Sequence, residues 1–146
     1  RQDLRRAIAT GGAGIRITEE PFVYLDKNYV RMFRGIGPAV RKARELEGRA
    51  VVVQLRGERA SLAEEAREAV QAGARILMVD TGNLEDLRLV KEVALEDGRD
   101  QVKVAFGGGV TIDNLERVIA AGADIVDVGR AIIDAPLLDF SLDVRK

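Results

Sequence analysis

Three consecutive glycines, Gly107, Gly108 and Gly109, are the residues of this sequence best suited to bind an anion. They follow an apolar run that ends at Phe106 and precede a helical pattern that starts at Ile112. Glycine lets backbone N–H groups approach an anion closely, and the N-terminus of a helix attracts negative charge. A phosphate group therefore suits this loop, although a tight turn between a strand and a helix would also use these glycines.

A second loop of the same kind follows one unit later, where Gly129 ends an apolar run and Arg130 comes next. The guanidinium of an arginine forms charge-assisted hydrogen bonds with phosphate. In many β/α barrels, two neighbouring loops after the last strands share one phosphate. We therefore interpret the segment from Val102 to Asp134 as a phosphate-binding element and expect a phosphorylated small molecule as the ligand. The role of Asp127, inside the last apolar run, stays open.

Three further polar residues lie at the ends of other apolar runs: Lys27, Gln54 and Asp80. The Asp80 carboxylate suits a sugar hydroxyl or a magnesium ion, but an Asp before Thr-Gly-Asn also forms turns and caps helices, so both interpretations stay open. Lys27 suits a phosphate or carboxylate partner, whereas a lone lysine on a turn is often only solvated. We predict Asp80 and Lys27 as catalytic residues, Asp80 as the ligand of a Mg²⁺ cofactor, and Gln54 as a ligand contact.

Histidine and cysteine are absent, which excludes imidazole bases, thiolate nucleophiles, disulfides and metal sites built on either residue. Asp, Glu, Lys, Arg and Tyr remain as candidates for acid–base chemistry. The formal net charge is −1, from 23 basic and 24 acidic side chains, so no overall field attracts nucleic acid or an anionic membrane. We expect neither as a partner, and any anion site must be local.

The elements that must position these residues follow from the alternation of apolar runs with helical patterns, which is typical of β/α units and a parallel sheet. The predicted strands are Phe22–Leu25, Ala50–Leu55, Arg75–Val79, Val102–Phe106 and Ile125–Val128. The predicted helices are a short basic helix over the first nine residues, Pro38–Leu46, a helix from a capping box at Ser61 and Glu64 to Gln71, Leu84–Leu95 and Ile112–Ala121. In such folds the functional residues lie where strands pass into the following loops.

Two stretches repeat one another: Ala69–Asp80 and Val118–Gly129 each contain an Ala-Gly-Ala corner between a helical pattern and an apolar run. A repeated helix–corner–strand unit favours a barrel or part of one. The predicted fold class is α/β, either a partial TIM-barrel-like structure or an open parallel sheet of about five β/α units. Because five strands are too few to close an eight-stranded barrel, we expect the sheet edges to pair in a homo-oligomer, by default a dimer, or to be completed by residues outside this chain.

The length of 146 residues, with 47% apolar and 32% charged residues, is typical of one globular domain. We expect a single β/α domain over residues 1–146, and the start at Arg1 rather than Met suggests part of a longer natural chain. No apolar run approaches the roughly 20 residues that cross a bilayer, so we expect a cytoplasmic protein. Abundant Glu and Arg with few Asn and Gln indicate a thermophile.

Three motifs resemble segments of one known family. Ala135-Pro-Leu-Leu-Asp-Phe-Ser-Leu142 is similar to an Ala-Pro-x-Leu-Asp-x-Ser-Leu ending, Gly108-Gly109-Val-Thr-x-x-Asn114 matches a second segment, and Phe22–Tyr29 falls where the family has an apolar strand leading into Lys-Asp-Asn-His. On these motifs the sequence, from roughly Gly14 to Leu142, resembles the C-terminal barrel of the type II phosphoribosyltransferases, the quinolinate (nicotinate-nucleotide pyrophosphorylase) kind.

The resemblance implies a magnesium-dependent reaction of quinolinate with phosphoribosyl pyrophosphate that gives nicotinate mononucleotide, pyrophosphate and carbon dioxide. It also implies that Asp80 addresses the ribose and the metal, and that Gly108, Gly109 and Gly129 belong to the phosphate loops. The sequence departs from the family where Lys-Asp-Asn-His appears as Asp26-Lys27-Asn28-Tyr29 and where Gln54 replaces an expected carboxylate. The family's N-terminal domain and its Arg/His/Lys cluster for the dicarboxylate have no counterpart in this sequence.

Three classes of function therefore compete. The first is a phosphoribosyltransferase that transfers the phosphoribosyl group to a pyridine carboxylate. The second is another sugar-phosphate barrel enzyme, since the stretch up to Ile132 also resembles hexulose-phosphate synthases and orotidine-phosphate decarboxylases, although their Asp-x-Lys-x-x-Asp strand exit is missing. The third is a non-catalytic relative that only binds a nucleotide or phosphate.

Overall fold

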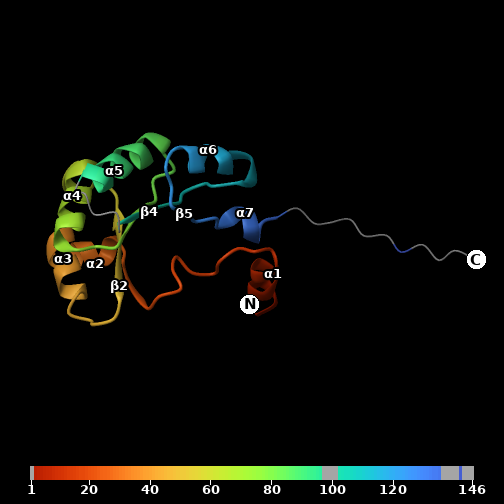
Figure 1. The fold of residues 1–146 in the computed structure, drawn as a ribbon, viewed down its shortest axis with the longest axis horizontal. Coiled ribbons are helices and arrows are strands. Elements are labelled where there is room, and N and C mark those ends of the chain that lie inside the picture. Colours follow the sequence, from red (N-terminus) through yellow and green to blue (C-terminus); the bar gives the residue numbers. More distant parts are fainter. Residues whose placement is uncertain (1, 97–101, 136–141, 143–146) are drawn as a thin grey trace, which may run out of the picture.

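The computed structural model describes residues 2–96, 102–135 and 142, and its centre is a sheet of five parallel strands in the order β1-β2-β3-β4-β5 (Figure 1). The strands are β1 (Phe22–Leu25), β2 (Ala50–Leu55), β3 (Ile76–Val79), β4 (Lys103–Phe106) and β5 (Ile125–Val126). Strands that are neighbours both in sequence and in space, joined by helical crossovers, are the arrangement of consecutive β/α-barrel units. The predicted α/β class and parallel sheet are confirmed.

Helices occupy the connections between the strands, and one further helix lies before β1 and one after β5. The connecting elements are α2 (Lys27–Met32), α3 (Ile36–Ala43), α4 (Leu62–Ala72), α5 (Leu84–Glu96), a 3₁₀ turn at Ile112–Asn114 and α6 (Leu115–Ala120). α1 (Gln2–Thr10) precedes β1, and α7 (Arg130–Ile133) follows β5. α3, α4 and α5 pack against one another and against the sheet in one layer, as Figure 1 shows. None of the described helices is long and apolar enough to cross a membrane.

The predicted start of α4 is confirmed in its atomic contacts. The Glu64 amide donates to Ser61 Oγ at 3.3 Å, and the Ser61 amide donates to Glu64 Oε2 at 2.9 Å, which is a complete capping box. α4 ends at Gly73, whose φ of +97° is the left-handed conformation that glycine adopts without strain. The repeated corner after α6 uses Gly122 in the same way, with φ +102°.

Some boundaries differ from the prediction for local reasons. The helix predicted over Pro38–Leu46 lies at Ile36–Ala43, with Pro38 still in its first turn. The helix predicted over Ile112–Ala121 opens as a 3₁₀ turn, because the Asn114 side chain accepts from the Thr111 amide at 2.8 Å and donates to Gly109 O at 3.1 Å. β5 ends at Val126 rather than Val128. The motif at 135–142 lies outside the described residues except for its first and last positions.

The helix α2 differs from the prediction, since the sequence predicts a strand-exit loop from Asp26 to Tyr29. It forms because Asp26 caps it: Asp26 Oδ1 accepts from the amides of Asn28 at 2.8 Å and Tyr29 at 3.1 Å. These hydrogen bonds, first the one from Tyr29, hold the pKa of the Asp26 carboxyl below its ordinary value. Asp26 is therefore engaged in starting a helix.

The two faces of the sheet have different neighbours. One face packs under the helices, with fully buried Val53, Leu77, Val104 and Phe106 in the main core. The other, which we call the inner face, carries Val52, Ile76, Met78 and Ala105, with partly buried apolar side chains packed on them from the rest of the sheet and from the segment before β1. All six residues of β2 are buried, as expected for a central strand of a parallel sheet.

Candidate functional site

The strand register brings the predicted polar residues to one edge of the sheet. Val79 pairs with Phe106, and Phe106 pairs with Val126. The next residues along each strand are Asp80, Gly107 and Asp127, which therefore share one row at the carboxyl ends of β3, β4 and β5. We call this end of the sheet the mouth, the position where β/α folds place their ligands.

Gln54, on β2, links the residues that follow β1 and β3 at the mouth. Its Nε2 donates to Asp80 Oδ2 at 2.9 Å, and its Oε1 accepts from the backbone N of Lys27 at 3.2 Å. Gln54 is 9% exposed, so both bonds lie away from bulk water and fix its orientation. The side chain therefore presents a donor to Asp80, and no hydrogen bond from the described residues reaches Asp80 Oδ1.

Gly107 lies between two carboxylates. A Cβ on this residue would stand 2.8 Å from Met78 Cε, 3.3 Å from Asp80 Oδ1 and 3.5 Å from Asp127 Cβ. The absence of a side chain thus leaves the space between Asp80 and Asp127 open at the centre of the mouth. The Gly107 amide donates to Val79 O at 2.9 Å, so it belongs to the sheet and is not a donor for a ligand.

Gly108 and Gly109 are the two glycines whose amides remain for an anion. Both have positive φ, +91° and +89°, and within the described part of the chain neither amide donates a hydrogen bond. A Cβ on Gly108 would stand 2.7 Å from the backbone N of Gly82, so the loops after β3 and β4 touch through their backbones. Gly109 has no atom within 4 Å of a Cβ position and faces open space.

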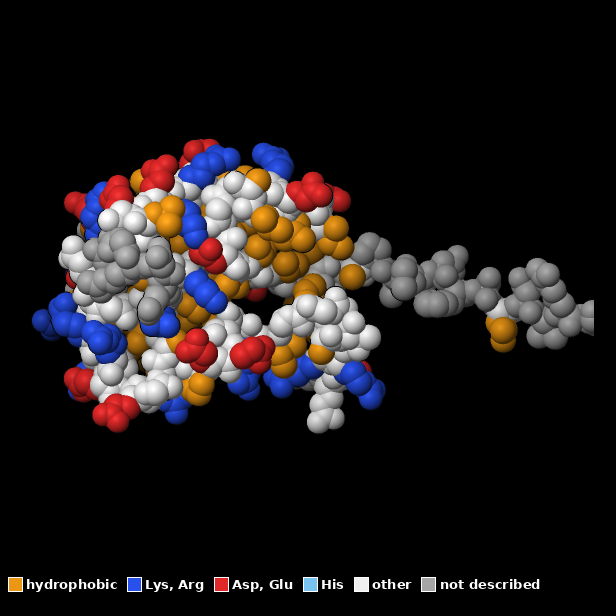
Figure 2. Space-filling model, in the orientation of Figure 1, with side chains coloured by type: hydrophobic (Ala, Val, Ile, Leu, Met, Phe, Trp, Pro, Cys, Tyr) orange, Lys and Arg blue, Asp and Glu red, His pale blue; other side chains and the backbone are white. Residues whose placement is uncertain are grey.

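The glycine loop also borders a groove of about 530 Å³ between α5 and α6. Its lining includes Gly108 and Gly109, the apolar Phe106 and Val118, and the charged Glu85, Arg88 and Arg117. Arg88 forms an ion pair with Glu85, so Arg117 is the cation of this lining that no carboxylate of the described residues pairs with. Basic and acidic side chains are intermixed over the face drawn in Figure 2, so an anion here depends on the amides of the glycine loop and on Arg117.

The second loop that the sequence predicts to bind phosphate contains Gly129 and Arg130. Gly129 follows β5 and has open space at its Cβ position. Arg130 begins α7, and its Nε donates to Asp134 Oδ2 at 3.0 Å with the side chain 92% exposed. The Arg130 side chain therefore pairs with Asp134, the C-cap residue of α7, and among the described residues it forms no hydrogen bond with the loop at Gly107–Gly109.

Tyr24 is a residue of the mouth that the sequence analysis did not identify. It lies on the inner face of β1, beside residues such as Met78, and is partly buried. Burial, followed by the negative charges of Asp80, Asp127 and Asp26, raises the pKa of its hydroxyl from 10.0 to about 12. The alternation of side chains along β1, with Phe22 and Tyr24 on one face, was the available signal.

We expect a titration of the Tyr24 hydroxyl to show the pKa shift caused by its burial and by the neighbouring carboxylates. The chain has two tyrosines and no tryptophan, so Tyr29→Phe leaves Tyr24 alone to give a tyrosinate absorbance change. Its midpoint should lie at about 12. Since the pKa is raised in the folded state, its stabilising contribution is complete below pH 10 and is lost as the pH rises towards 12, and Tyr24→Phe should remove that loss. A midpoint near 10 would contradict the placement of Tyr24 beside these charges.

Comparison with known proteins gives the context for this geometry. A family model described as quinolinate phosphoribosyl transferase, C-terminal domain, matches residues 3–143. The human nicotinate-nucleotide pyrophosphorylase (carboxylating) is 32% identical over 132 residues, which cover 90% of this chain and 43% of the human protein. A ribulose-phosphate 3-epimerase from Serratia marcescens is 40% identical over 55 residues, 38% of this chain and 26% of that protein.

Solved structures agree in fold. The crystal structure of NadC from Streptococcus pyogenes aligns with a TM-score of 0.76 and 22% identity over 97% of this chain and 47% of that one. The chain spans less than half the length of the human and streptococcal proteins. Since the family model covers nearly the whole chain and the human relative exceeds 30% identity over most of it, this chain belongs to the quinolinate phosphoribosyltransferase family, in its C-terminal domain.

Proposed function

We propose that the mouth binds a phosphoribosyl ligand and takes part in the transfer of the phosphoribosyl group to a pyridine dicarboxylate. The observation that carries the proposal is the pair of amides at Gly108 and Gly109, which donate to no described residue, beside the Asp80–Gln54 pair in a domain of this family. Because the chain spans less than half of its relatives, the complete reaction is part of the proposal.

The phosphate group lies at the glycine loop in this proposal. Backbone amides in left-handed glycines form a concave donor site for a tetrahedral anion. The Tyr24 hydroxyl, protonated at neutral pH, and the Asp80 carboxylate then face the ribose, whose hydroxyls both donate and accept hydrogen bonds. Gln54 is a positioning residue here, since it holds Asp80 and contacts Lys27 through its other end.

Asp80 and Asp127 would hold a magnesium ion. Both are hard oxygen donors, and the bare Gly107 leaves room between them. In the described part of the chain, no cluster of three or more acidic side chains could hold a metal, so ligand oxygens and water must complete the coordination. Magnesium commonly binds in this way, through one or two carboxylates and substrate phosphates. When bound, it supplies positive charge that stabilises a departing diphosphate.

Another sugar-phosphate enzyme is the second candidate. The short match to a ribulose-phosphate 3-epimerase favours it, since a phosphate loop of this kind serves several barrel enzymes. Ribulose 5-phosphate separates the two functions. Binding of ribulose 5-phosphate that is tighter than binding of phosphoribosyl pyrophosphate or nicotinate mononucleotide would favour the second candidate.

The test is calorimetric titration of the chain and of Asp80→Asn with phosphoribosyl pyrophosphate, with and without magnesium. We expect magnesium to tighten binding at least about tenfold in the unchanged chain, and Asp80→Asn to lose this gain while it keeps magnesium-free binding. Glu92→Gln, which removes an exposed negative charge from the second half of α5, is the matched control. Turnover of quinolinate tests the transfer itself. No binding of phosphoribosyl pyrophosphate, nicotinate mononucleotide or ribulose 5-phosphate would sink the proposal.

A further inference from the structure

The glycine loop lies between two compartments of the domain. Gly107 faces the mouth, where its Cβ position is 3.3 Å from Asp80 Oδ1. Phe106, one residue earlier, lies on the opposite face of the sheet, in the core under the helices, because side chains alternate along a strand. Gly108 and Gly109 follow at the end of β4 and line the groove between α5 and α6, which we call the outer groove. A phosphate at their amides therefore borders both the mouth and the outer groove.

The outer groove is larger than a phosphate group requires. Its volume of about 530 Å³ is typical of sites for small organic molecules, which range from about 300 to 1,000 Å³. Its apolar lining is formed by Phe106 and Val118, each 2% exposed. Next to the glycine loop the lining is backbone, since a Cβ on Gly82 would stand 2.5 Å from Gly108 O. The groove therefore has room for an organic group attached to the phosphate.

The lining of the outer groove has a surplus of positive charge. Arg88 pairs with Glu85 and offsets its negative charge. Arg117, on α6, is exposed, and no carboxylate of the described residues pairs with it. A guanidinium can donate two parallel hydrogen bonds to a phosphate group. Arg117 therefore suits a second phosphate, beside the one at the glycine loop.

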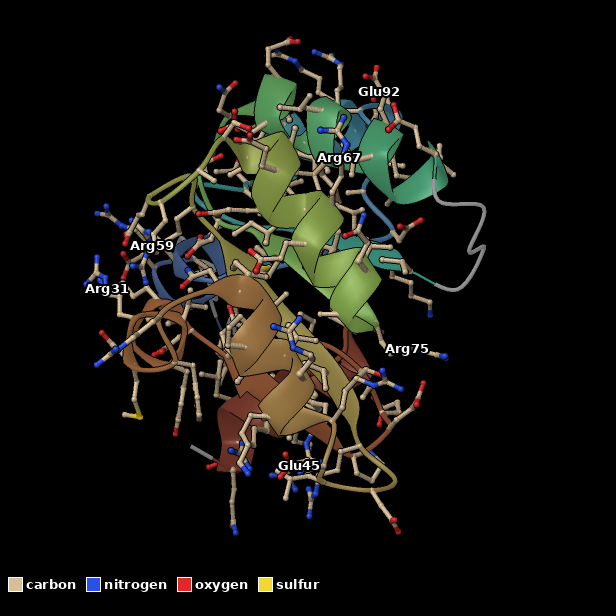
Figure 3. The ribbon with its side chains drawn as sticks, turned by 90° about the vertical axis from the view of Figure 1, so that its left-hand side faces the viewer. Arg31, Glu45, Arg59, Arg67, Arg75 and Glu92 are labelled. Carbon is tan, nitrogen blue, oxygen red and sulfur yellow. The ribbon has the colours of Figure 1, made fainter. Side chains whose placement is uncertain are left out.

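The depression on the other side of α5 lacks this combination. It lies between α4 and α5, and its volume is about 230 Å³. Its two charged lining residues, Arg67 and Glu96, pair with each other at 3.7 Å, and Figure 3 shows Arg67 on the outward surface of α4. None of the described residues that line it belongs to the glycine loop. The outer groove is distinguished by its contact with that loop and by its unpaired cation.

We propose that the outer groove binds the distal half of a nucleoside diphosphate ribose whose proximal phosphate lies at the glycine loop. The ribose of this ligand lies in the mouth, the distal phosphate lies at Arg117, and the nucleoside lies on the apolar lining. The inference rests on the phosphate site of the proposed function. It adds a second class of ligand, which competes with the phosphoribosyl ligand because both use the same glycine loop.

The test is calorimetric titration with ADP-ribose, which is ribose 5-phosphate joined through its phosphate to AMP, and with each half separately. ADP-ribose should bind at least about tenfold tighter than ribose 5-phosphate, because its distal phosphate gains charge-assisted hydrogen bonds. Arg117→Ala should remove this gain and change ribose 5-phosphate binding by less than about threefold. Arg117→Lys should keep part of the gain, since the positive charge remains.

Arg5→Ala is the matched control. Arg5 is exposed on α1, which Figure 1 shows apart from α5 and α6, so its replacement removes one positive charge far from the outer groove. This variant should keep the whole gain for ADP-ribose. The buried neighbour Val118 is unchanged in Arg117→Ala, so the circular dichroism spectrum of that variant should match that of the unchanged chain.

Four results would overturn the groove site. ADP-ribose could bind no tighter than ribose 5-phosphate, or equally well to Arg117→Ala and Arg5→Ala, and the proposed function would then still stand. AMP that binds as tightly as ADP-ribose would show that one phosphate and one nucleoside account for the binding. ADP-ribose binding that Gly109→Asp does not weaken would place its phosphate away from the glycine loop. Absence of binding by both ribose 5-phosphate and ADP-ribose would remove the phosphate site and the groove site together.

Discussion

Gly109→Asp is expected to weaken the binding of ribose 5-phosphate about 100-fold, because it places a carboxylate beside the amides of Gly108 and Gly109. A like charge within a few ångströms of a phosphate costs about 3 kcal/mol at partly exposed sites. Gly109 is the better probe than Gly108, since a Cβ there meets nothing within 4 Å, whereas a Cβ on Gly108 would stand 2.7 Å from Gly82 N. Calorimetric titration measures the effect.

A second glycine provides a closely matched control. Gly48 has φ +67°, compared with +89° at Gly109, and it also has open space at its Cβ position. It precedes β2, at the opposite end of the sheet from the mouth. Gly48→Asp carries the same backbone strain and the same added charge, so it should bind ribose 5-phosphate as the unchanged chain does. Equal binding by the two variants would mean that the phosphate lies elsewhere.

Glu65→Ala is expected to lower the free energy of unfolding by about 3 kcal/mol, because it leaves four backbone amides of the loop after β2 without their acceptor. Denaturant unfolding followed by circular dichroism measures the change. Glu68→Ala, on the exposed side of the same helix, should stay within about 0.5 kcal/mol of the unchanged chain. A similar stability of both variants would contradict the role of Glu65.

The loop should also lose its order in Glu65→Ala. The four amides of residues 56–59 would then lose their acceptor, so their hydrogen exchange should become faster as the stability falls. Glu65→Gln separates the two effects, since an amide oxygen can still accept from part of the loop. It should lie between Glu65→Ala and the unchanged chain in both measurements.

Local sequence signals predicted much of the fold. The Val-rich run Ala50–Leu55 is a strand with the predicted bounds, and the Ser61–Glu64 capping box starts α4 as predicted. These signals succeed because strand burial, helix periodicity and capping depend on residues near one another in the chain. The motifs at Gly108–Asn114 and Phe22–Tyr29 also led to the family that the match over residues 3–143 confirms.

Other local features were missed because two signals competed. The sequence Asp26-Lys27-Asn28-Tyr29 follows an apolar run and predicts a strand-exit loop, whereas Asp26 starts α2 by accepting two backbone amides. The Gly107–Gly109 run predicts backbone amides for an anion, and the ladder between β3 and β4 uses the amide of Gly107. Three identical residues give no indication of which amide will donate a hydrogen bond to the neighbouring strand.

The sequence and the tertiary structure therefore determine different properties of the glycine loop and of the residues around it. The amino-acid sequence by itself determined that glycines follow a buried strand and precede a helix, because local burial and turn chemistry require no distant partner. Only the tertiary structure decided which amides stay free, that Gln54 donates to Asp80, that Tyr24 lies near Asp80 and Asp127, and that α2 meets the loop held by Glu65. Those contacts depend on the register of parallel strands and on crossovers between them, which join residues far apart in the chain.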